Sequence, residues 1–393
     1  MSSLKFTGCI LLVISCMIGG GILALPIVAN QFGLLATYAL MIFAYIIMLI
    51  SGLFTLELSS KLPVYKNNFS SIAENSFGKY SKYLIMFSFA VTLYTVLTAY
   101  ISASPDIFLN TFLKNYSFNY QNEILSLIFT ILLGGLVVAN ISYAEKLNSF
   151  VMIIKLASLV VAIIFLNLNA PSFTGFEIKS LTHISQGFSV IILVFSYQSI
   201  IPSLVNYVGK NNVKSLRWVL ITATTSTLII SLLWINAIVS LVSPFGDKYQ
   251  EHLTLGELIQ IIDTYKLGGF TTAFLKAFFN ITLIASFIAL SIAFIDFLID
   301  MLKLKYTLMN RIYCGFIAYI PCWLIANFYS DLFIKAVAIS GFSGLFFALL
   351  LPSLASYKLY SKEKFQLFNG KLIRVLMSII SIVILSTIAT GIF

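Results

Sequence analysis

The stretch IGGGILALP, residues 18–26, places three consecutive glycines inside an apolar segment long enough to cross a membrane. A bilayer core takes about 20 apolar residues per helix. Each glycine lowers helix propensity by about 1 kcal/mol relative to alanine, so the run Gly19-Gly20-Gly21 favours an interruption. Because glycine carries no side chain, a ligand can also approach the backbone closely there. The stretch therefore predicts a membrane helix that is unwound part-way across.

The composition of the whole chain is that of a membrane protein. Of its 393 residues, 60% are hydrophobic and only 10% are charged, and the mean hydropathy is +1.00. A soluble domain carries about 25% charged residues. The net charge of +10 does not indicate nucleic acid as a partner, because the basic residues lie in short loops rather than in one stripe. We therefore expect most of the chain to be surrounded by lipid.

Cysteine and motif content exclude most catalytic classes. The four cysteines lie in apolar segments without metal-ligand spacing, which predicts buried thiols, no metal site and no cofactor: Cys9, Cys16, Cys314 and Cys322. The chain has no phosphate-binding loop, no Gly-x-Ser-x-Gly elbow and no HExxH motif, so we expect neither an enzyme nor an ATP-driven pump.

Eleven segments are long and apolar enough to span a bilayer. They lie near residues 7–30, 34–59, 81–110, 123–141, 148–168, 183–208, 216–241, 270–302, 310–328, 333–357 and 371–392. The longest loop, about 242–269, contains a periodic apolar pattern that predicts a short helix at the membrane surface.

The basic residues test this count, because cytoplasmic loops are enriched in them. With the N-terminus inside, 17 of the 24 fall on the cytoplasmic side: Lys5, Lys61, Lys66, Lys79, Lys82, Lys146, Lys210, Lys214, Arg217, Lys303, Lys305, Arg311, Lys358, Lys362, Lys364, Lys371 and Arg374. Six fall outside: Lys114, Lys179, Lys248, Lys266, Lys276 and Lys335. The asymmetry predicts a cytoplasmic N-terminus and a C-terminus on the opposite side.

A second interruption lies in the sixth span, where Phe195-Ser196-Tyr197-Gln198-Ser199 is followed by Pro202. If five spans form one unit, the sixth starts from the opposite face to the first, and transporters often bind substrate at such paired breaks. We therefore expect an all-α membrane protein with a five-plus-five inverted repeat and one extra helix. The repeats would cover about 7–168 and 183–357, and the extra helix about 371–392.

The paired breaks predict a binding site. The half-helix after the glycine run presents free N–H groups and a positive dipole end, which suits a carboxylate. The alternative is that the glycines only permit close helix packing. The predicted substrate site consists of Ile18, Gly19, Gly20, Gly21, Tyr94, Tyr100, Phe195, Ser196, Tyr197, Gln198 and Ser199.

Other polar residues inside spans are candidates for coupling or packing. Lys155, in the fifth span, has three open interpretations: proton exchange, replacement of a bound sodium ion, or snorkelling to the inner interface. Ser286 and Ser291, in the eighth span, serve either an ion site or helix contacts. Asp296 and Asp300, near the cytoplasmic end of that span, are expected to pair with neighbouring lysines.

Several blocks resemble the hydroxy/aromatic amino acid permease family. They are IGGGILALP at 18–26, LTAYIS at 97–102, IPSLVNY at 201–207, LRWV at 216–219, DFLID at 296–300 and LPSL at 351–354. The resemblance, strongest to bacterial tyrosine-specific permeases, implies the fold of the amino acid/polyamine/organocation superfamily. It also implies proton-driven uptake of an aromatic amino acid through the bacterial inner membrane. In that superfamily a fifth-span lysine of some proton-coupled members occupies the region where sodium binds in others, and Lys155 resembles it.

The chain departs from the family at Gln198, where similar permeases have a histidine in a Phe-Gly-aromatic-His-Gly stretch. Glutamine can hydrogen-bond a hydroxyl or an indole, but it cannot change charge. A permease for serine, threonine or another neutral amino acid, driven by protons or sodium, is therefore the alternative. A membrane sensor or channel fits less well, because short loops leave no room for an output domain and the breaks are asymmetric.

Overall fold

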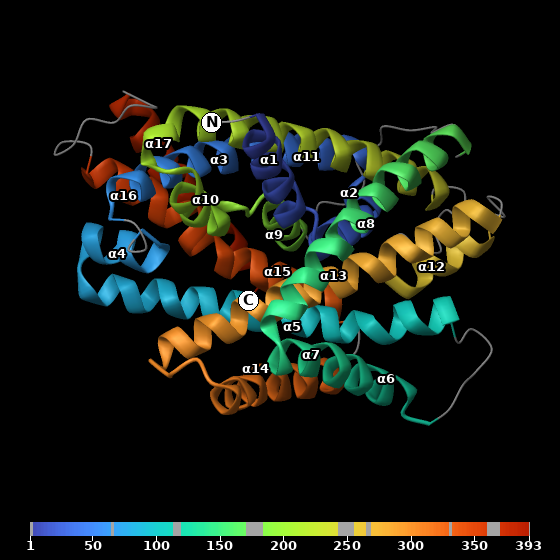
Figure 1. The fold of residues 1–393 in the computed structure, drawn as a ribbon. Coiled ribbons are helices and arrows are strands. Elements are labelled where there is room, and N and C mark those ends of the chain that lie inside the picture. The colour runs from blue at the N-terminus through green and yellow to red at the C-terminus, as the bar shows by residue number, and fades with distance from the viewer. Residues whose placement is uncertain are drawn as a thin grey trace.

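The computed structural model describes residues 3–63, 67–112, 119–169, 184–242, 255–264, 269–329, 332–359 and 370–392. Every regular element in these ranges is helical. In order they are α1 Ser3–Met17, α2 Gly20–Phe32, α3 Leu34–Lys61, α4 Phe69–Phe77, α5 Lys79–Phe112, α6 Gln121–Phe129, η1 Thr130–Gly134, α7 Gly135–Ala139, α8 Ile141–Asn169, α9 Ile184–Val194, η2 Gln198–Ile200, α10 Ile201–Val208, η3 Lys210–Asn212, α11 Val213–Val242, α12 Leu255–Thr264, α13 Gly269–Met301, α14 Leu308–Phe328, α15 Leu332–Leu345, η5 Phe346–Leu350, α16 Leu351–Leu359 and α17 Lys371–Ile392 (Figure 1).

The described residues contain the expected number of membrane spans. Ten helices are long and apolar enough to cross a bilayer, and the bent pair α1 and α2 makes an eleventh. The chain is therefore an all-α, multi-pass membrane protein. The loop helix expected after the seventh span is present as α12, whereas much of the surrounding loop and the basic residues Lys248 and Lys266 lie outside the described residues.

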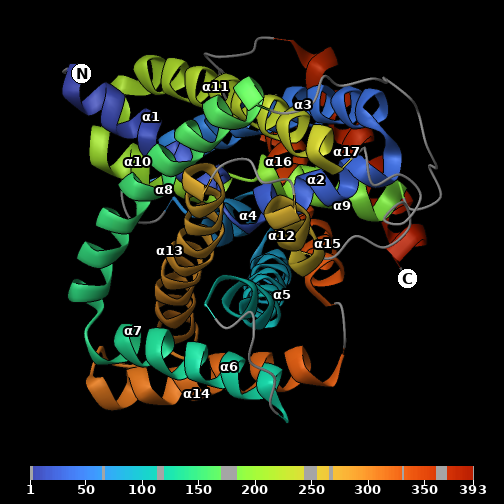
Figure 2. The same ribbon diagram turned by 90° about the vertical axis from the view of Figure 1, so that its right-hand side faces the viewer.

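The helices form two groups joined by α5 and α13 (Figure 2). On one side, α6, α7 and α14 run next to one another as an outer layer that packs on α5 and α13. On the other side lie α1, α2, α3, α9 and α11, and α15 connects this group to α5 through extensive contacts with α5 and α9. The short helices α4 and α12 lie at opposite ends of the molecule (Figure 1).

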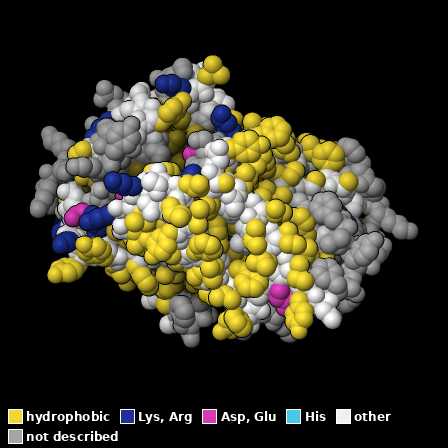
Figure 3. All heavy atoms as spheres, turned by 60° about the horizontal axis from the view of Figure 1, so that its bottom comes forward, with side chains coloured by type: hydrophobic (Ala, Val, Ile, Leu, Met, Phe, Trp, Pro, Cys, Tyr) yellow, Lys and Arg dark blue, Asp and Glu magenta, His cyan; other side chains and the backbone are white. Residues whose placement is uncertain are grey.

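The face of the molecule drawn in Figure 3 is apolar over its middle and basic at one end. Large apolar side chains such as Phe87, Ile131, Phe316 and Leu372 are more than half exposed, which a lipid environment accommodates. Lys and Arg side chains gather at the left of Figure 3, the end at which Figure 1 places α4. Because lipid rather than water surrounds this apolar surface, the protein does not need charged side chains over its middle.

The two broken spans end in the same way. Gly33 follows α2 with φ +84°, and Gly209 follows α10 with φ +88°. Each glycine N–H donates to a carbonyl four residues earlier, on Ala29 and Val205 respectively. A left-handed backbone at these positions favours glycine, so both helices stop at a residue suited to the turn.

Two expectations from the sequence are wrong. Cys16 has an accessible surface, unlike Cys9, Cys314 and Cys322, although it lies deep within the protein, near the end of α1 and beside the break. Asp296 accepts a hydrogen bond from Tyr306, and within the described residues no ion pair joins Asp296 or Asp300 to Lys303 or Lys305. The loop after α13 turns tightly, with Lys303 at φ +53°, and brings the tyrosine rather than a lysine to the carboxylate.

Candidate functional site at the broken helices

The first break exposes backbone groups that a continuous helix would bond internally. The axes of α1 and α2 differ by 52°. Gly19 between them is extended, with φ −116° and ψ −151°. Its N–H donates to the Met17 carbonyl at 3.0 Å, so the regular ladder stops there. The carbonyl end of α1 and the N–H end of α2 consequently meet at one point.

Tyr100 occupies the N-terminus of α2. Its hydroxyl accepts a hydrogen bond from the Gly20 N–H at 3.0 Å, and the side chain is 5% exposed. A Cβ added at Gly20 would lie 3.0 Å from both Cζ and Oη of Tyr100 and closer still to its Cε1. Glycine at position 20 is therefore what allows α5 to bring a hydroxyl onto the opened backbone.

The other two glycines have different surroundings. A Cβ at Gly19 would lie 3.5 Å from the Tyr100 Oη and 3.8 Å from the Ser286 Oγ, at ordinary contact distance. A Cβ at Gly21 would lie only 2.9 Å from Cγ2 of Val194, the last residue of α9. Gly21 thus permits close packing of α2 on α9, and this packing places the two breaks next to each other. Within this run, Gly20 fits the binding interpretation and Gly21 fits the packing interpretation.

At the second break, two polar side chains contact α3. Residues 195–197 are not helical. The Gln198 Nε2 donates to the Met48 carbonyl of α3 at 3.1 Å, and the Tyr197 hydroxyl lies 3.5 Å from the same oxygen. A Cβ at Gly52 would overlap the Tyr197 hydroxyl, so this glycine makes room for the ring. Tyr197 and Gln198 are both fully buried against α3.

The serines of the second break are more accessible. Ser196 is half-buried and donates to the Ile192 carbonyl at 3.1 Å, while Ser199 is exposed. The Ser199 hydroxyl lies beside the Cys16 thiol, which is also exposed. Between the breaks the accessible polar surface is therefore formed by Ser199 and Cys16, while Phe195 packs edge-on against Tyr45 with ring centroids 6.3 Å apart.

Lys155 binds the carbonyl end of α1. Its ammonium donates to the Ile18 carbonyl at 2.6 Å and lies 3.4 Å from the Ser15 carbonyl. The side chain is 2% exposed, so it does not snorkel to an interface. A cation at the C-terminal end of a helix opposes the negative end of the dipole. The break thus holds a lysine at its carbonyl end and a tyrosine at its N–H end.

The eighth span and the third contribute one residue each to this cluster. Ser286 on α13 lies next to the Tyr100 hydroxyl. Ser291 instead lies beside the Tyr319 hydroxyl of α14. Tyr94 donates to the Ile317 carbonyl at 3.0 Å and packs on Phe294 with ring centroids 4.6 Å apart. Tyr94 and Ser291 therefore belong to the packing of α5, α13 and α14.

Sequence reasoning missed Trp234 of α11. Its indole Nε1 donates to the Ile22 carbonyl of α2 at 3.0 Å, and the fully buried ring packs on Phe278 with centroids 5.1 Å apart. The available signal was that a tryptophan within an apolar span needs an acceptor for its N–H. The acceptor lies in the interrupted helix, which the sequence did not reveal. Among the described residues no group of three His, Cys, Asp or Glu could hold a metal ion.

These features define a multi-pass α-helical membrane protein whose two adjacent broken spans carry a polar cluster contributed by α5, α8 and α13. The chain belongs to the tryptophan/tyrosine permease family, whose sequence model matches residues 2–390. The family consists of amino acid transport proteins, so the chain is not an enzyme. The resemblance seen in the sequence blocks is confirmed over nearly the whole chain.

Individual relatives transport different amino acids. The chain is 24% identical to tyrosine-specific transport system 1 of Haemophilus influenzae, over 97% of this chain and 96% of that protein. It is 25% identical to the low affinity tryptophan permease of Proteus vulgaris, over 90% of this chain and 88% of that protein. It is also 24% identical to glutamine transporter 2 of Aliivibrio fischeri, over 91% and 90%.

Proposed function

We propose that the chain imports an aromatic amino acid, tyrosine before tryptophan or phenylalanine, across the bacterial inner membrane by proton symport. The observation that supports this proposal best is the opened N-terminus of α2, where the Gly20 N–H is held by the Tyr100 hydroxyl. A helix N-terminus favours a negative ligand. The amino acid carboxylate would accept from Gly20 in place of the phenol.

The names of the relatives support the side-chain class. Two of those described above carry tyrosine or tryptophan in their names, and one carries glutamine. Each of these side chains carries a hydrogen-bond donor. A serine, threonine or other neutral amino acid is the alternative substrate, and the glutamine relative gives that alternative a specific basis. The described cluster supplies Ser199, Ser286 and the Tyr100 hydroxyl as polar partners.

Lys155 is the proposed coupling residue. Its ammonium neutralises the carbonyl end of α1 at a buried position 2.6 Å from the Ile18 oxygen. The lysine ammonium can release its proton and take it up again, so protonation can control this contact. Loss of that proton would remove the charge that strengthens the bond to Ile18 and make it easier for α1 to move against α8. Sodium is the alternative coupling ion.

The similarity of the two broken spans supports the proposed repeat organisation. Each span opens at a short non-helical stretch and ends at a left-handed glycine, Gly33 or Gly209. We propose inverted repeats at about 7–168 and 183–357 with 371–392 outside them, and a cytoplasmic N-terminus. The binding site then lies between the repeats, where binding can alternate between the two faces.

The proposed carboxylate contact is tested by inhibition of labelled tyrosine uptake. Unlabelled tyrosine should compete fully, whereas tyrosine methyl ester, which lacks the anionic oxygen, should compete at least tenfold more weakly, the result of losing about 1.4 kcal/mol or more of charge-assisted hydrogen bonding. Tyramine, which lacks the carboxylate altogether, should not compete. Equal inhibition by tyrosine and its ester would show that the substrate carboxylate does not bind at the N-terminus of α2.

A further inference from the structure

The two half-helices α1 and α10 lie next to each other (Figures 1 and 2) and meet at two places. At the breaks, the Ser199 hydroxyl, which directly precedes α10, lies beside the Cys16 thiol of α1. Near the start of α1, the Lys5 ammonium lies 5.4 Å from the centroid of the Tyr207 ring, near the end of α10. The two helices therefore run in opposite directions, with the sides that carry these residues turned toward each other.

The side of α1 that meets α10 is accessible between the two contacts. Leu12 lies seven residues after Lys5 and four before Cys16, so the three residues share one face of the helix. All three are exposed, Leu12 to 45%. Val13, the next residue along the chain, points to another face and is buried.

The facing side of α10 is accessible in the same way. Ser199, Ser203 and Tyr207 recur every four residues and are all exposed. Leu204, on another side, is buried, because α10 packs mainly on α3. α1 instead packs mainly on α11. Side chains between two packed helices would be buried, so the accessible faces of α1 and α10 border a gap.

The gap reaches the broken-helix site. Cys16 keeps an accessible surface although it lies deep within the protein, which requires a hollow beside it. Gly19 is partly accessible, and a Cβ there would lie 3.8 Å from the Ser286 Oγ. Ser286 is 8% exposed, and its Oγ has no hydrogen-bond partner among the described residues. Buried hydroxyls are normally bonded, so the inner end of the gap suits a polar ligand.

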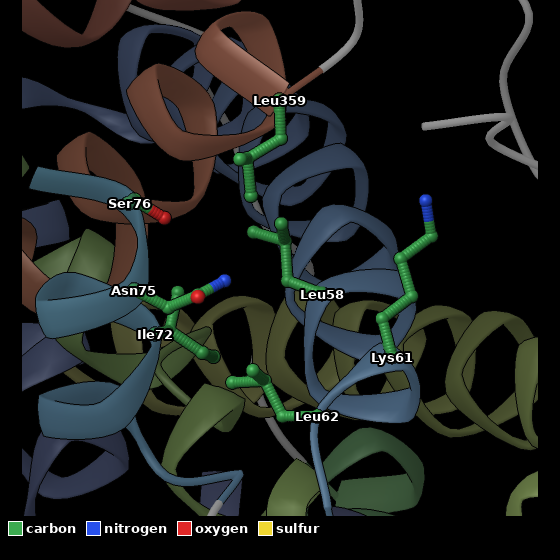
Figure 4. A pocket seen from close by; sticks show the side chains of 7 residues that line it. All are labelled: Leu58, Lys61, Leu62, Ile72, Asn75, Ser76 and Leu359. Atoms are coloured by element: carbon green, nitrogen blue, oxygen red, sulfur yellow. The ribbon is translucent and has the colours of Figure 1, made fainter. Parts of the chain in front are cut away.

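α10 is fastened to the turn between α3 and α4. The side-chain amides of Asn206 and Asn67 bond each other twice, at N–O distances of 3.0 and 3.3 Å. The Lys210 ammonium donates to the Leu62 carbonyl at the end of α3. Leu62 in turn lies close to Ile72 of α4 (Figure 4). The α10 wall of the gap is therefore held in place, and the width of the gap depends on α1.

We propose that this gap is the passage by which the amino acid leaves the broken-helix site, toward the side of the membrane where Lys5 and Tyr207 lie. The inference rests on the proposed function, because it assigns a route to that substrate. A rise of 1.5 Å per residue makes the passage about 12–17 Å long. Its lining, from the site to the mouth, is Cys16, Ser199, Leu12, Ser203, Lys5 and Tyr207.

The position of Lys155 relates the passage to the proposed coupling. Its ammonium binds the Ile18 carbonyl, directly after α1. Because α1 is the wall that is not tied to α3, a weaker contact at Ile18 would change the width of the passage beside Cys16. Substrate release would then follow loss of the proton without a movement of α10.

The test is the reaction of Cys16 with sulfonatoethyl methanethiosulfonate, an anionic thiol reagent that does not cross membranes. Inside-out and right-side-out vesicles containing the full-length protein are treated separately, and mass spectrometry measures the added group. The thiolate attacks the sulfenyl sulfur, a mixed disulfide forms, methanesulfinate leaves and the thiol proton passes to water. Cys9, Cys314 and Cys322 are buried, so Cys16→Ser should leave the protein unmodified.

Further cysteine substitutions, made in that serine variant, map the lining. Lys5→Cys marks the side on which the passage opens. Leu12→Cys and Ser203→Cys should react from the same side as Lys5→Cys. Val13→Cys and Leu204→Cys are matched controls one residue further along each helix, where the native side chains are 0% and 3% exposed. These controls should react roughly tenfold more slowly, because a buried thiol is inert.

Tyrosine should protect Cys16 from the reagent. At about ten times its dissociation constant, tyrosine leaves about a tenth of the sites free, so the reaction should slow about tenfold. Protection by serine, threonine or glutamine but not by tyrosine would support the passage and refute the aromatic substrate. The two proposals can therefore fail separately.

Three results would overturn the passage. The first is reaction of Cys16 only from the side opposite to that of Lys5→Cys. The second is equal reaction of Leu12→Cys and Val13→Cys, or of Ser203→Cys and Leu204→Cys. The third is a rate of Cys16 modification that no amino acid changes, since a substrate that occupies the inner end of the passage must slow the reagent.

Discussion

Replacing Gly20 by alanine should disable the transporter through a single methyl group. The added Cβ would lie 3.0 Å from the Tyr100 Cζ and Oη and closer to Cε1, where real Cβ atoms do not occur. The Tyr100 ring cannot withdraw freely, because it is 5% exposed and fixed on the long helix α5. Either the ring or the start of α2 must move.

The contributions to this substitution can be compared. Overpacking a tight site costs about 1–3 kcal/mol, and loss of the Gly20–Tyr100 hydrogen bond costs about 1 kcal/mol more. The gain in helix propensity from glycine to alanine returns about 1 kcal/mol. The net destabilisation is therefore about 1–3 kcal/mol. Because the displaced backbone is the proposed carboxylate site, uptake should fall at least tenfold, equivalent to about 1.4 kcal/mol.

The assay combines labelled tyrosine uptake, normalised to protein in the membrane, with thermal unfolding of the purified protein. Gly8→Ala is the matched control, because a Cβ at Gly8 of α1 meets no atom within 4 Å. It should leave both measurements unchanged or raise the unfolding temperature slightly. In a Tyr100→Ala background the space exists, so Gly20→Ala should there destabilise little, a non-additive result. Wild-type uptake by Gly20→Ala, or equal destabilisation in both backgrounds, would refute the proposed geometry.

Two further substitutions test the coupling lysine and the second break. Lys155→Ala removes the bond to Ile18 and should abolish uptake driven by a pH gradient while substrate binding survives; undiminished gradient-driven uptake, with and without sodium, would contradict the coupling role. Gly52→Ala places a Cβ on the Tyr197 hydroxyl and should destabilise the protein by about 1–3 kcal/mol, measured by thermal unfolding. Because the added Cβ would also lie 2.7 Å from the Tyr197 Cζ, Tyr197→Ala, which removes the whole ring, should largely relieve that effect, and an unrelieved loss would show that the clash lies elsewhere.

The membrane spans could be predicted closely from sequence. The segment expected near 34–59 is helical over Leu34–Lys61, and the one expected near 371–392 over Lys371–Ile392. Apolar length and the spacing of basic residues determine these elements almost independently of tertiary contacts. The location of both breaks was also predictable from local sequence, because Gly19-Gly20-Gly21 and the Ser196–Ser199 stretch are poor helix formers.

The direction of each side chain at the breaks could not be predicted. In a helix the 3.6-residue period assigns residues to faces, but residues 195–197 are not helical and have no such period. Gln198, which we expected to contact the substrate, is instead fully buried and donates to the Met48 carbonyl of α3. Its role in substrate selection therefore stays a prediction, and its contact with α3 supports a role in shaping the break.

Partners that come from distant helices were also beyond the sequence. Tyr100 and Tyr94 differ by six residues on one helix, yet one bonds the N-terminus of α2 and the other the Ile317 carbonyl of α14. Similarly, Lys155 was recognisable as an intramembrane charge, but its acceptor lies 137 positions away. Such contacts depend on how whole helices pack, which no local pattern encodes.

Substrate counterflow in proteoliposomes tests the proposed transport of aromatic amino acids most directly. Proteoliposomes containing the purified protein would be loaded with an excess of one unlabelled amino acid and then exposed to the same amino acid in labelled form. The amino acids compared would be tyrosine, tryptophan, phenylalanine, serine, threonine and glutamine. We expect tyrosine to exchange fastest, followed by tryptophan or phenylalanine, with little exchange of serine or threonine. Exchange of serine, threonine or glutamine without exchange of any aromatic amino acid would contradict the proposal.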